Sequence, residues 1–231
     1  MGCLSSRSHS SIEATLVENE KFLGFCQLDA EVTDSIIRKF SFNRKINCSQ
    51  LSKIAESLNI HIEDYDAHAN ITKMYNRLKN SDNEILMRDL LTIGILLSKG
   101  RNITKATLLF QIFDETLEEE IEITRIKGQV FRTISRNSIY ILGALIDENN
   151  EDSTKRIQNY FKTLKRAEIF AIDNVVDFIL DDKRKPTISE KGFVEGMCRF
   201  QSGKLLTASG WRKYLASFEE KLPLELQNSQ L

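Results

Sequence analysis

Apolar residues recur at helical spacing along most of the chain, and short polar stretches separate the apolar segments. In the clearest case, Leu109, Ile112 and Phe113 follow the i, i+3, i+4 spacing of one helix, which ends at Asp114. An acidic gap follows, and then a second helical face that consists of Ile123, Ile126, Val130 and Ile134. The pattern predicts two amphipathic helices on either side of one acidic loop.

The same order of helix, polar loop and helix is predicted three more times. The expected helices cover residues 31–40 and 48–58, 71–78 and 86–98, and 169–180 and 190–200. Each of the four loops contains one isoleucine: Ile46, Ile85, Ile121 and Ile188. Their numbers differ by 39, 36 and 67, and the longest interval leaves room for a helical extension to Ile146 and a polar break over 147–152. We expect Ser153 and Thr154 to cap the helix after that break.

The N-terminus carries the most specific short motif. Met1-Gly2-Cys3-Leu4-Ser5-Ser6 matches the signal M-G-x-x-x-[ST], in which Gly2 carries a myristoyl group after Met1 is removed. One such chain binds a membrane marginally and reversibly, so a second signal is needed, and the adjacent Cys3 is well placed for palmitate. We therefore expect a lipid-anchored protein on the cytoplasmic face of a membrane. The alternative is an accidental match at the start of the N-terminal arm, which we place at residues 1–29 and expect to be helical or irregular.

Composition and charge narrow the function classes. The 231 residues are 41% hydrophobic and 28% charged, which suits one globular domain or two fused lobes. A net charge of −1 gives no electrostatic sign of nucleic-acid binding, and four scattered cysteines indicate neither a disulfide framework nor a zinc site. One cluster carries several side chains suited to acid–base or metal chemistry, but it matches no known motif: His61, Glu63, Asp64, Asp66 and His68. We expect no enzymatic activity.

The segment around Phe113-Asp114 and Ile121 resembles the EF-hand superfamily. In that family a loop of about twelve residues lies between two helices and offers oxygen ligands at positions 1, 3, 5, 7, 9 and 12. The resemblance covers about residues 30–200. Together with the N-terminal motif, it points to regulatory proteins with an acylated N-terminus, such as calcineurin B and the neuronal calcium sensors.

The resemblance implies an all-α fold of four EF-hand-like units in two paired lobes. One pair would occupy residues 30–100, and the other would occupy 101–200 with an inserted helical linker. Short β bridges between paired loops would place Ile46 opposite Ile85 and Ile121 opposite Ile188. Burial of each isoleucine contributes about 1.5–3 kcal/mol, so core packing can hold the pairs without the energy of a bound ion.

The third loop offers the best set of oxygen ligands. The candidate metal ligands are Asp114, Thr116, Glu118 and Glu122, at positions 1, 3, 5 and 9. Position 6 normally needs glycine but holds Glu119, and position 12 normally supplies a bidentate glutamate but holds Arg125. We expect this loop to keep its shape and to bind calcium weakly at most.

The other three loops depart further from the ligand pattern. The first has no carboxylate at its side-chain ligand positions, Lys39, Ser41, Asn43, Asn47 and Gln50. The second begins at Leu78, which has no side-chain oxygen, and its polar set is Asn80, Asp82 and Asp89. The fourth opens with Asp181, but lysines follow at positions 3 and 5, and Pro186 occupies the turn position.

The last predicted element is an amphipathic helix within residues 201–231. Its apolar side comprises Trp211, Tyr214, Leu215, Phe218 and Leu222, and Pro223 ends it. This helix either packs permanently against the body or fills a groove from which a partner helix can displace it. The resemblance implies a membrane-tethered adaptor or regulatory subunit that binds an amphipathic helix of a larger protein. It needs no cofactor beyond weakly bound Ca²⁺ and no nucleic acid, and the alternative is a genuine calcium sensor of the same family.

Overall fold

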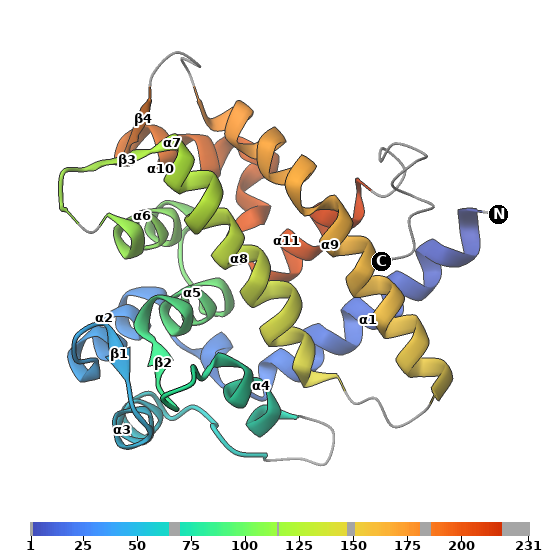
Figure 1. Ribbon diagram of the computed structural model, residues 1–231, viewed down its shortest axis with the longest axis horizontal. Coiled ribbons are helices and arrows are strands. Elements are labelled where there is room, and N and C mark those ends of the chain that lie inside the picture. The colour runs from blue at the N-terminus through green and yellow to red at the C-terminus, as the bar shows by residue number, and fades with distance from the viewer. Residues whose placement is uncertain (1, 65–69, 115, 147–150, 181–185, 219–231) are drawn as a thin grey trace.

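The computed structural model describes residues 2–64, 70–114, 116–146, 151–180 and 186–218. Within these ranges the chain is mostly helical, with two small two-stranded sheets (Figure 1). The expected all-α fold class is confirmed. Among the described helices, none combines the length and the apolar character needed to cross a bilayer.

The first half of the chain alternates helices with two short strands. Its elements are α1 (Gly2–Lys21), η1 (Phe25–Gln27), α2 (Ala30–Phe40), β1 (Lys45–Ile46), α3 (Cys48–Leu58), α4 (Ile71–Leu78), β2 (Ile85–Leu86) and α5 (Met87–Leu97). Local signals fix the ends of α3. The side chains of Asn47 and Gln50 exchange hydrogen bonds with each other's backbone N–H in a capping box, and Asn59 ends the helix in the left-handed conformation.

The second half repeats this order and includes the longest helix, α9, of 29 residues. Its elements are α6 (Asn102–Phe113), β3 (Glu120–Glu122), α7 (Ile123–Arg125), η2 (Ile126–Phe131), α8 (Arg132–Arg136), η3 (Asn137–Ile141), η4 (Leu142–Leu145), α9 (Glu151–Ile179), β4 (Thr187–Ser189), α10 (Glu190–Arg199), η5 (Phe200–Leu206) and α11 (Ala208–Ala216). The elements from α7 to η4 follow one another as a single rod, which we call the long helix, residues 123–145 (Figure 1). Two of its turns, η2 and η3, are π-helical.

The arm expected at residues 1–29 contains the 20-residue helix α1 and the short η1, which agrees with the helical alternative. Two boundaries differ from the sequence predictions. Ser153 and Thr154 are not N-caps, because α9 begins at Glu151 and continues to Ile179. The last helix stops at Ala216, where the backbone N–H of Ser217 donates to the carbonyl groups of two residues in the preceding turn. Leu222 and Pro223, expected at the end of this helix, lie outside the described residues.

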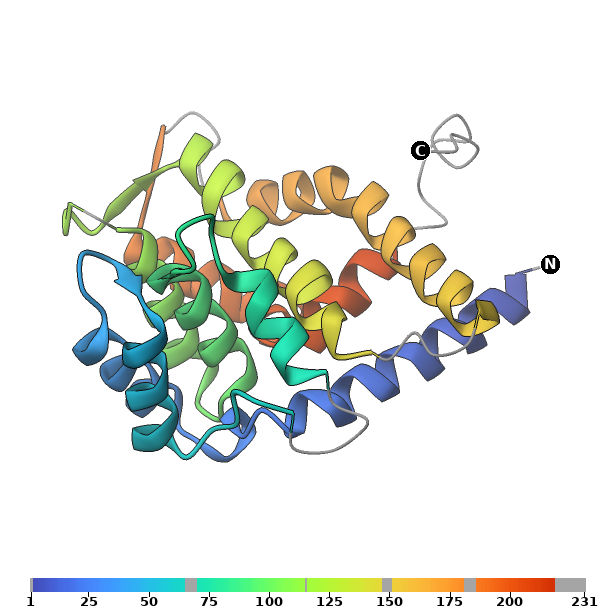
Figure 2. The same cartoon turned by 60° about the horizontal axis from the view of Figure 1, so that its bottom comes forward.

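The two sheets join the four loops in pairs. In the antiparallel pair β1–β2, Ile46 lies opposite Ile85, and in the antiparallel pair β3–β4, Ile121 lies opposite Ile188. All four isoleucine side chains are buried. These are the two pairings expected from the sequence. The sheets lie toward one end of the molecule, and the start of α1 lies at the other (Figure 2).

One continuous core joins both halves of the chain. The buried apolar side chains of all the main helices belong to a single cluster. Helices α5 and α6, which lie on either side of the expected boundary at residue 100, pack against each other, and α2 also packs on α6. The two pairs of helix–strand–helix segments therefore do not have separate hydrophobic cores.

A lysine is buried where α5, α6 and η5 meet. The side chain of Lys105 is 4% exposed, and its Nζ donates to the carbonyl oxygens of Leu96 and Leu206 at 3.4 Å each. Burial lowers the pKa of Lys105 to about 8. An unfolded lysine has a pKa near 10.4. Between these values the unfolded chain binds a proton that the folded chain has released, so stability rises with pH from about 8 to about 10.4.

We expect Lys105→Met to stabilise the protein by about 2 kcal/mol at pH 7. The substitution removes the cost of burying the charge, about 1.4 kcal/mol for each unit by which the pKa is lowered, and the loss of two long hydrogen bonds offsets part of this gain. The gain should shrink as the pH rises to 10. Urea unfolding at pH 7, 8, 9 and 10 measures it, with the exposed Lys191→Met as the matched control. A pH slope that survives in Lys105→Met, or appears equally reduced in Lys191→Met, would contradict the assignment.

Candidate functional site

The first loop closes on itself through a tight turn. Phe42 and Lys45 exchange both backbone hydrogen bonds, each 2.9 Å long, across Asn43 and Arg44. Both central residues have positive φ, 48° and 59°, which is the geometry of the two-residue hairpin turn that matches strand twist. The backbone polar groups therefore pair within the loop. This agrees with the absence of carboxylates among its expected ligand positions.

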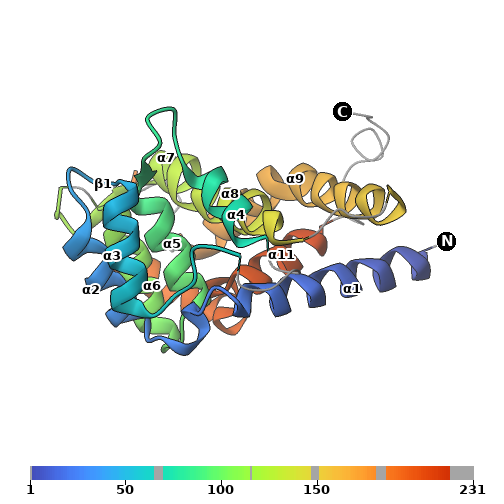
Figure 3. The same ribbon diagram turned by 90° about the horizontal axis from the view of Figure 1, so that it is seen from below.

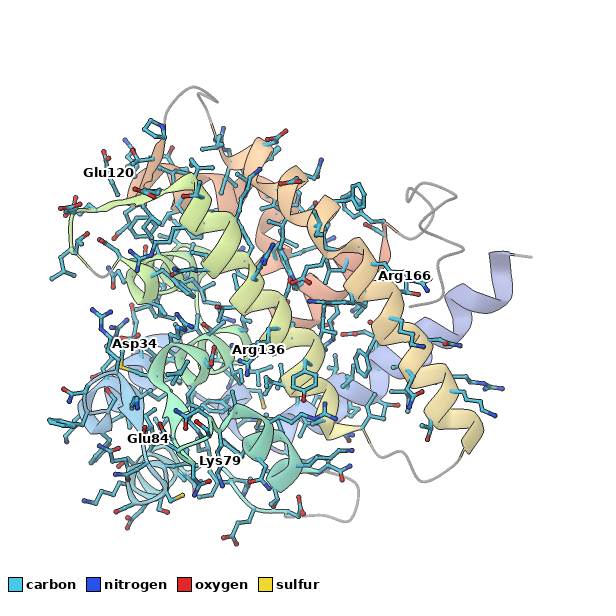
Figure 4. The ribbon with its side chains drawn as sticks, viewed as in Figure 1. Asp34, Lys79, Glu84, Glu120, Arg136 and Arg166 are labelled. Atoms are coloured by element: carbon cyan, nitrogen blue, oxygen red, sulfur yellow. The ribbon has the colours of Figure 1, made fainter. Side chains whose placement is uncertain are left out.

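In the second loop, the side-chain oxygens of the candidate ligands accept hydrogen bonds or form salt bridges within the protein. The side-chain oxygen of Asn80 accepts the backbone N–H groups of Asp82 and Glu84, both at 2.9 Å. The ammonium of Lys45 lies 2.6 Å from a carboxylate oxygen of Glu84 and 3.8 Å from one of Asp82 (Figure 4 labels Glu84 beside β2). A lysine from the paired loop thus supplies positive charge next to these acids.

The carboxylate at the twelfth position of the second loop forms a salt bridge with an arginine of the long helix. Asp89 is 4% exposed and accepts a hydrogen bond of 3.1 Å from Nη1 of Arg136 on α8. Burial raises the pKa of Asp89, while Arg136 and Arg88 lower it, and the net effect is upward. Asp89 therefore ties the second loop to the long helix.

In the third loop, the first candidate ligand accepts hydrogen bonds from other residues of the same loop. The carboxylate of Asp114 is 6% exposed and accepts the backbone N–H groups of Glu118 and Glu119 at 3.3 and 3.0 Å. Thr116 Oγ1 donates to the same carboxylate at 3.5 Å. Of the expected ligands, the structure brings Asp114 and Thr116 together, but the side chain of Glu122 accepts a hydrogen bond from Thr124. Within the described residues there is no cluster of three or more histidine, cysteine or acidic side chains that could hold a metal ion.

The three loops share one backbone feature at their sixth position. Arg44, Asn83 and Glu119 occupy this position, and their φ values are 59°, 62° and 58°. Left-handed backbone costs a residue with a Cβ roughly 1–2 kcal/mol, and asparagine tolerates it best. The turn is therefore retained without the glycine that would favour it, and the surrounding helices and strand pairs hold it in place.

The fourth loop lies partly outside the described residues, and Asp181 belongs to that part. What is described begins at Pro186, whose carbonyl oxygen accepts the backbone N–H of Ile123 at 2.9 Å. Ser189 Oγ then caps α10 by accepting the N–H of Gly192. In the polar cluster near residue 64, Asp64 accepts the backbone N–H of Thr72; its partners Asp66 and His68 also fall outside the described residues.

The last helix is enclosed by the C-terminal half of the chain. Helix α11 packs against α9, η5, η3 and α8, and Figure 1 shows it behind the long helix and α9. Trp211 is fully buried, its ring stacks on Phe131 at a centroid distance of 5.6 Å, and its Nε1 donates to Ser135 Oγ at 2.8 Å. Tyr214 and Leu215 are buried as well. Phe218 lies just beyond the helix with its ring 5.1 Å from that of Tyr214.

A buried ion network, which we call the Arg212 network, joins α11 to α1. Arg212 is 0% exposed; its Nε and Nη2 donate to the two carboxylate oxygens of Glu13 at 2.8 Å, and its Nη1 donates to Glu20 at 2.7 Å. The carbonyl of Ser138 accepts a further bond from Nη1, and the hydroxyl of Tyr160 donates to Glu13 at 2.9 Å. Every charge in the network is thus hydrogen-bonded, as burial requires.

Burial and charge act in opposite directions on the members of this network. Burial raises the pKa of Glu20, and the neighbouring guanidinium offsets only part of the rise. Burial alone would lower the pKa of Arg212, but the carboxylates of Glu20 and Glu13 raise it. The Arg212 network was not predicted from the sequence, although the spacing of its two glutamates along the chain indicates a shared side of one helix. Glu13 and Glu20 lie two turns apart, on the same side of α1 as the buried Leu16.

The two lipidation candidates lie at the free end of α1. The helix begins at Gly2 and includes Cys3. Its first turns form the right-hand extremity of the described structure in all three ribbon views (Figure 2). A helix rises about 1.5 Å per residue, so Gly2 stands roughly 15 Å along the axis from Ile12, which packs on the core.

The chain was compared with protein-family models, with curated proteins and with solved structures, and none of them matches it.

Proposed function

We propose that this protein is a membrane-tethered adaptor or regulatory subunit of EF-hand shape, which binds an amphipathic helix of a larger protein and does not need calcium to fold. The observation that carries the proposal is the pairing of loops through Ile46–Ile85 and Ile121–Ile188, each loop standing between two helices. In EF-hand proteins such loops enclose ions. Here the loop oxygens bind donors of the protein itself.

Three contacts support folding without calcium. The Lys45 ammonium sits beside Glu84, the Asn80 amide oxygen accepts two backbone N–H groups, and the Asp114 carboxylate accepts two more. The hydrogen bonds that Asn80 and Asp114 accept from backbone N–H groups stabilise by about 0.5–3 kcal/mol each. The burial of the four central isoleucines adds to them. The loops then keep the same conformation with and without calcium.

The helix-binding role rests on α11. An amphipathic helix fills the space between the long helix and α9, with Trp211 as its aromatic anchor and Leu215 buried one turn later. Helix-in-groove recognition uses anchors at this spacing. We propose that a partner helix takes the same place and that α11 leaves to admit it. The Arg212 network then sets the free energy that the partner must supply.

The membrane role rests on the N-terminal motif and the projecting start of α1. An acyl chain on Gly2 would lie at the end of α1, roughly 15 Å along the helix axis from Ile12, which packs on the core. It could enter a bilayer without unfolding the body. A myristoyl group alone binds with a constant near 10⁴ M⁻¹, and a palmitoyl group on Cys3 would convert this to stable attachment.

We expect the N-myristoylated protein to sediment with phosphatidylcholine vesicles and Gly2→Ala to stay in solution. In cells, Gly2→Ala should move the protein from the membrane fraction to the soluble fraction, and Cys3→Ser should do so partly. Sedimentation should be equal in calcium and in chelator, because no loop needs to bind an ion. Unchanged fractionation of Gly2→Ala would refute the lipid anchor, whereas sedimentation that requires calcium would favour the calcium sensor.

A further inference from the structure

Two adjoining hollows lie on the face formed by α4, the long helix and α9. Figure 3 shows these three elements along one side of the molecule and α1 along the opposite side. The first hollow, of about 230 Å³, lies between the second loop and α8 and is lined by Lys79, Arg88 and Asp89 among others. The second, of about 410 Å³, lies between α8 and α9 and is lined by Lys165 and Glu168 among others.

Two arginines separate the hollows and line both of them. Arg132 and Arg136 lie one helical turn apart on α8 and belong to each hollow. Figure 4 shows Arg136 near the middle of this face with Lys79 below it. A guanidinium at either position can therefore donate to a ligand on either side. The two hollows and this arginine ridge form one groove, which we call the basic groove.

Positive charge is in excess throughout the basic groove. Its five cationic side chains are Lys79, Arg88, Arg132, Arg136 and Lys165. Its two carboxylates are both buried and already paired: Asp89 with Arg136 at 3.1 Å, and Glu168 with Lys165 at 2.6 Å. The groove thus carries an excess of three positive charges on a chain whose net charge is −1.

Several donors of the groove remain available. Arg136 uses one of its five N–H groups on Asp89 and is 45% exposed. Arg132 is exposed, and among the described residues it has no hydrogen-bond or ion-pair partner through its side chain. Guanidinium groups bind phosphate through two parallel hydrogen bonds, and lysine adds a point charge. Each hollow combines these features, with Lys79 in one and Lys165 in the other.

We propose that the basic groove binds a compact ligand that carries two or more phosphate groups, one in each hollow, with Arg132 and Arg136 between them. A single phosphate would engage one hollow and leave the other unused. An inositol phosphate, free or as a lipid headgroup, has the required chemistry. This inference does not depend on the proposed adaptor role, because it uses neither the acyl chain nor the place of α11.

The test uses unacylated Gly2→Ala protein, so that lipid attachment cannot contribute. Inositol 1,4,5-trisphosphate is titrated by calorimetry, and inorganic phosphate serves as the single-group probe. In parallel, the protein is sedimented with phosphatidylcholine vesicles that contain phosphatidylinositol 4,5-bisphosphate, or phosphatidylserine at equal charge. The groove variant is Arg88→Gln/Arg132→Gln, in which both side chains are exposed. The matched control is Lys53→Gln/Arg101→Gln, which removes the same charge from exposed residues that line neither hollow.

We expect the trisphosphate to bind at least tenfold more tightly than inorganic phosphate, and the groove variant to lose at least tenfold in affinity while the control loses less than threefold. Stronger sedimentation with the bisphosphate lipid than with phosphatidylserine, abolished in the groove variant, would identify a lipid headgroup as the source. Binding of the free trisphosphate alone would identify a soluble ligand. Equal loss in both variants, or no preference for the trisphosphate over phosphate, would overturn the proposal. Matching melting curves establish that the variants are folded.

Discussion

Replacing Arg212 by methionine is expected to destabilise the protein by about 3–5 kcal/mol, because it leaves the buried carboxylates of Glu13 and Glu20 without their cation. For a chain of this length, a loss of this size lowers the melting temperature by on the order of 10 °C. Differential scanning calorimetry measures it. Limited proteolysis should also cut sooner within α11 and the second half of α1, since the network joins these two segments.

The effect of Arg212→Met should depend on pH in a defined direction. Without the guanidinium, burial raises the pKa of Glu20 further above its value in the unfolded chain, near 4.3, so the folded chain binds a proton there more readily. Stability of the variant then rises relative to wild type as the pH falls from 7 toward 5. The matched control is Glu13→Gln/Glu20→Gln/Arg212→Met, which removes all three charges and should recover much of the loss. A variant as stable as wild type at pH 7 would contradict the account of the network.

The double substitution Glu119→Gly/Arg125→Glu is expected to create calcium binding in the third loop, with a dissociation constant of about 10⁻⁴ M. Glycine suits the positive φ of 58° at the sixth position, and glutamate supplies the bidentate ligand at the twelfth in place of a cation. Asp114, Thr116 and Glu118 already lie at one end of this loop. Isothermal titration with calcium measures the change.

Two controls test whether both substitutions are needed and whether the ion binds in the third loop. Glu119→Gly alone should stabilise the fold by about 1 kcal/mol and bind no calcium, because Arg125 remains. Addition of Asp114→Ala to the double variant should abolish binding. If the double variant bound calcium equally well with Asp114→Ala, the ion would lie elsewhere, and the assignment of the loop positions would be wrong.

The sequence predicted the helices well because they depend on local periodicity, whereas the loop partners were predicted from the EF-hand resemblance. The bounds of α3 and α4 follow from apolar spacing, and the pairs Ile46–Ile85 and Ile121–Ile188 are those that the resemblance implies for the one isoleucine in each loop. A buried side chain in a short strand has few alternative partners, so its register is well determined. The EF-hand identity of the units is still a prediction.

Features that depend on distant contacts could not be predicted in the same way. The Arg212 network joins residues almost 200 positions apart, so the position of Glu13 and Glu20 on one side of α1 does not identify their partner when the sequence alone is read. The single core shared by both halves, and the use of Asp89 by Arg136, also depend on packing between elements. The basic groove likewise arises only when α4, α8 and α9 come together.

Calorimetric titration of calcium into chelator-stripped wild-type protein, with magnesium present and Asp114→Ala as the control, tests the central claim most directly. If the paired loops hold their geometry through the protein's own donors, no binding heat will appear at micromolar calcium, and the melting temperature will be the same in calcium and in chelator. Micromolar binding that disappears in Asp114→Ala would contradict this account and would make the protein a calcium sensor.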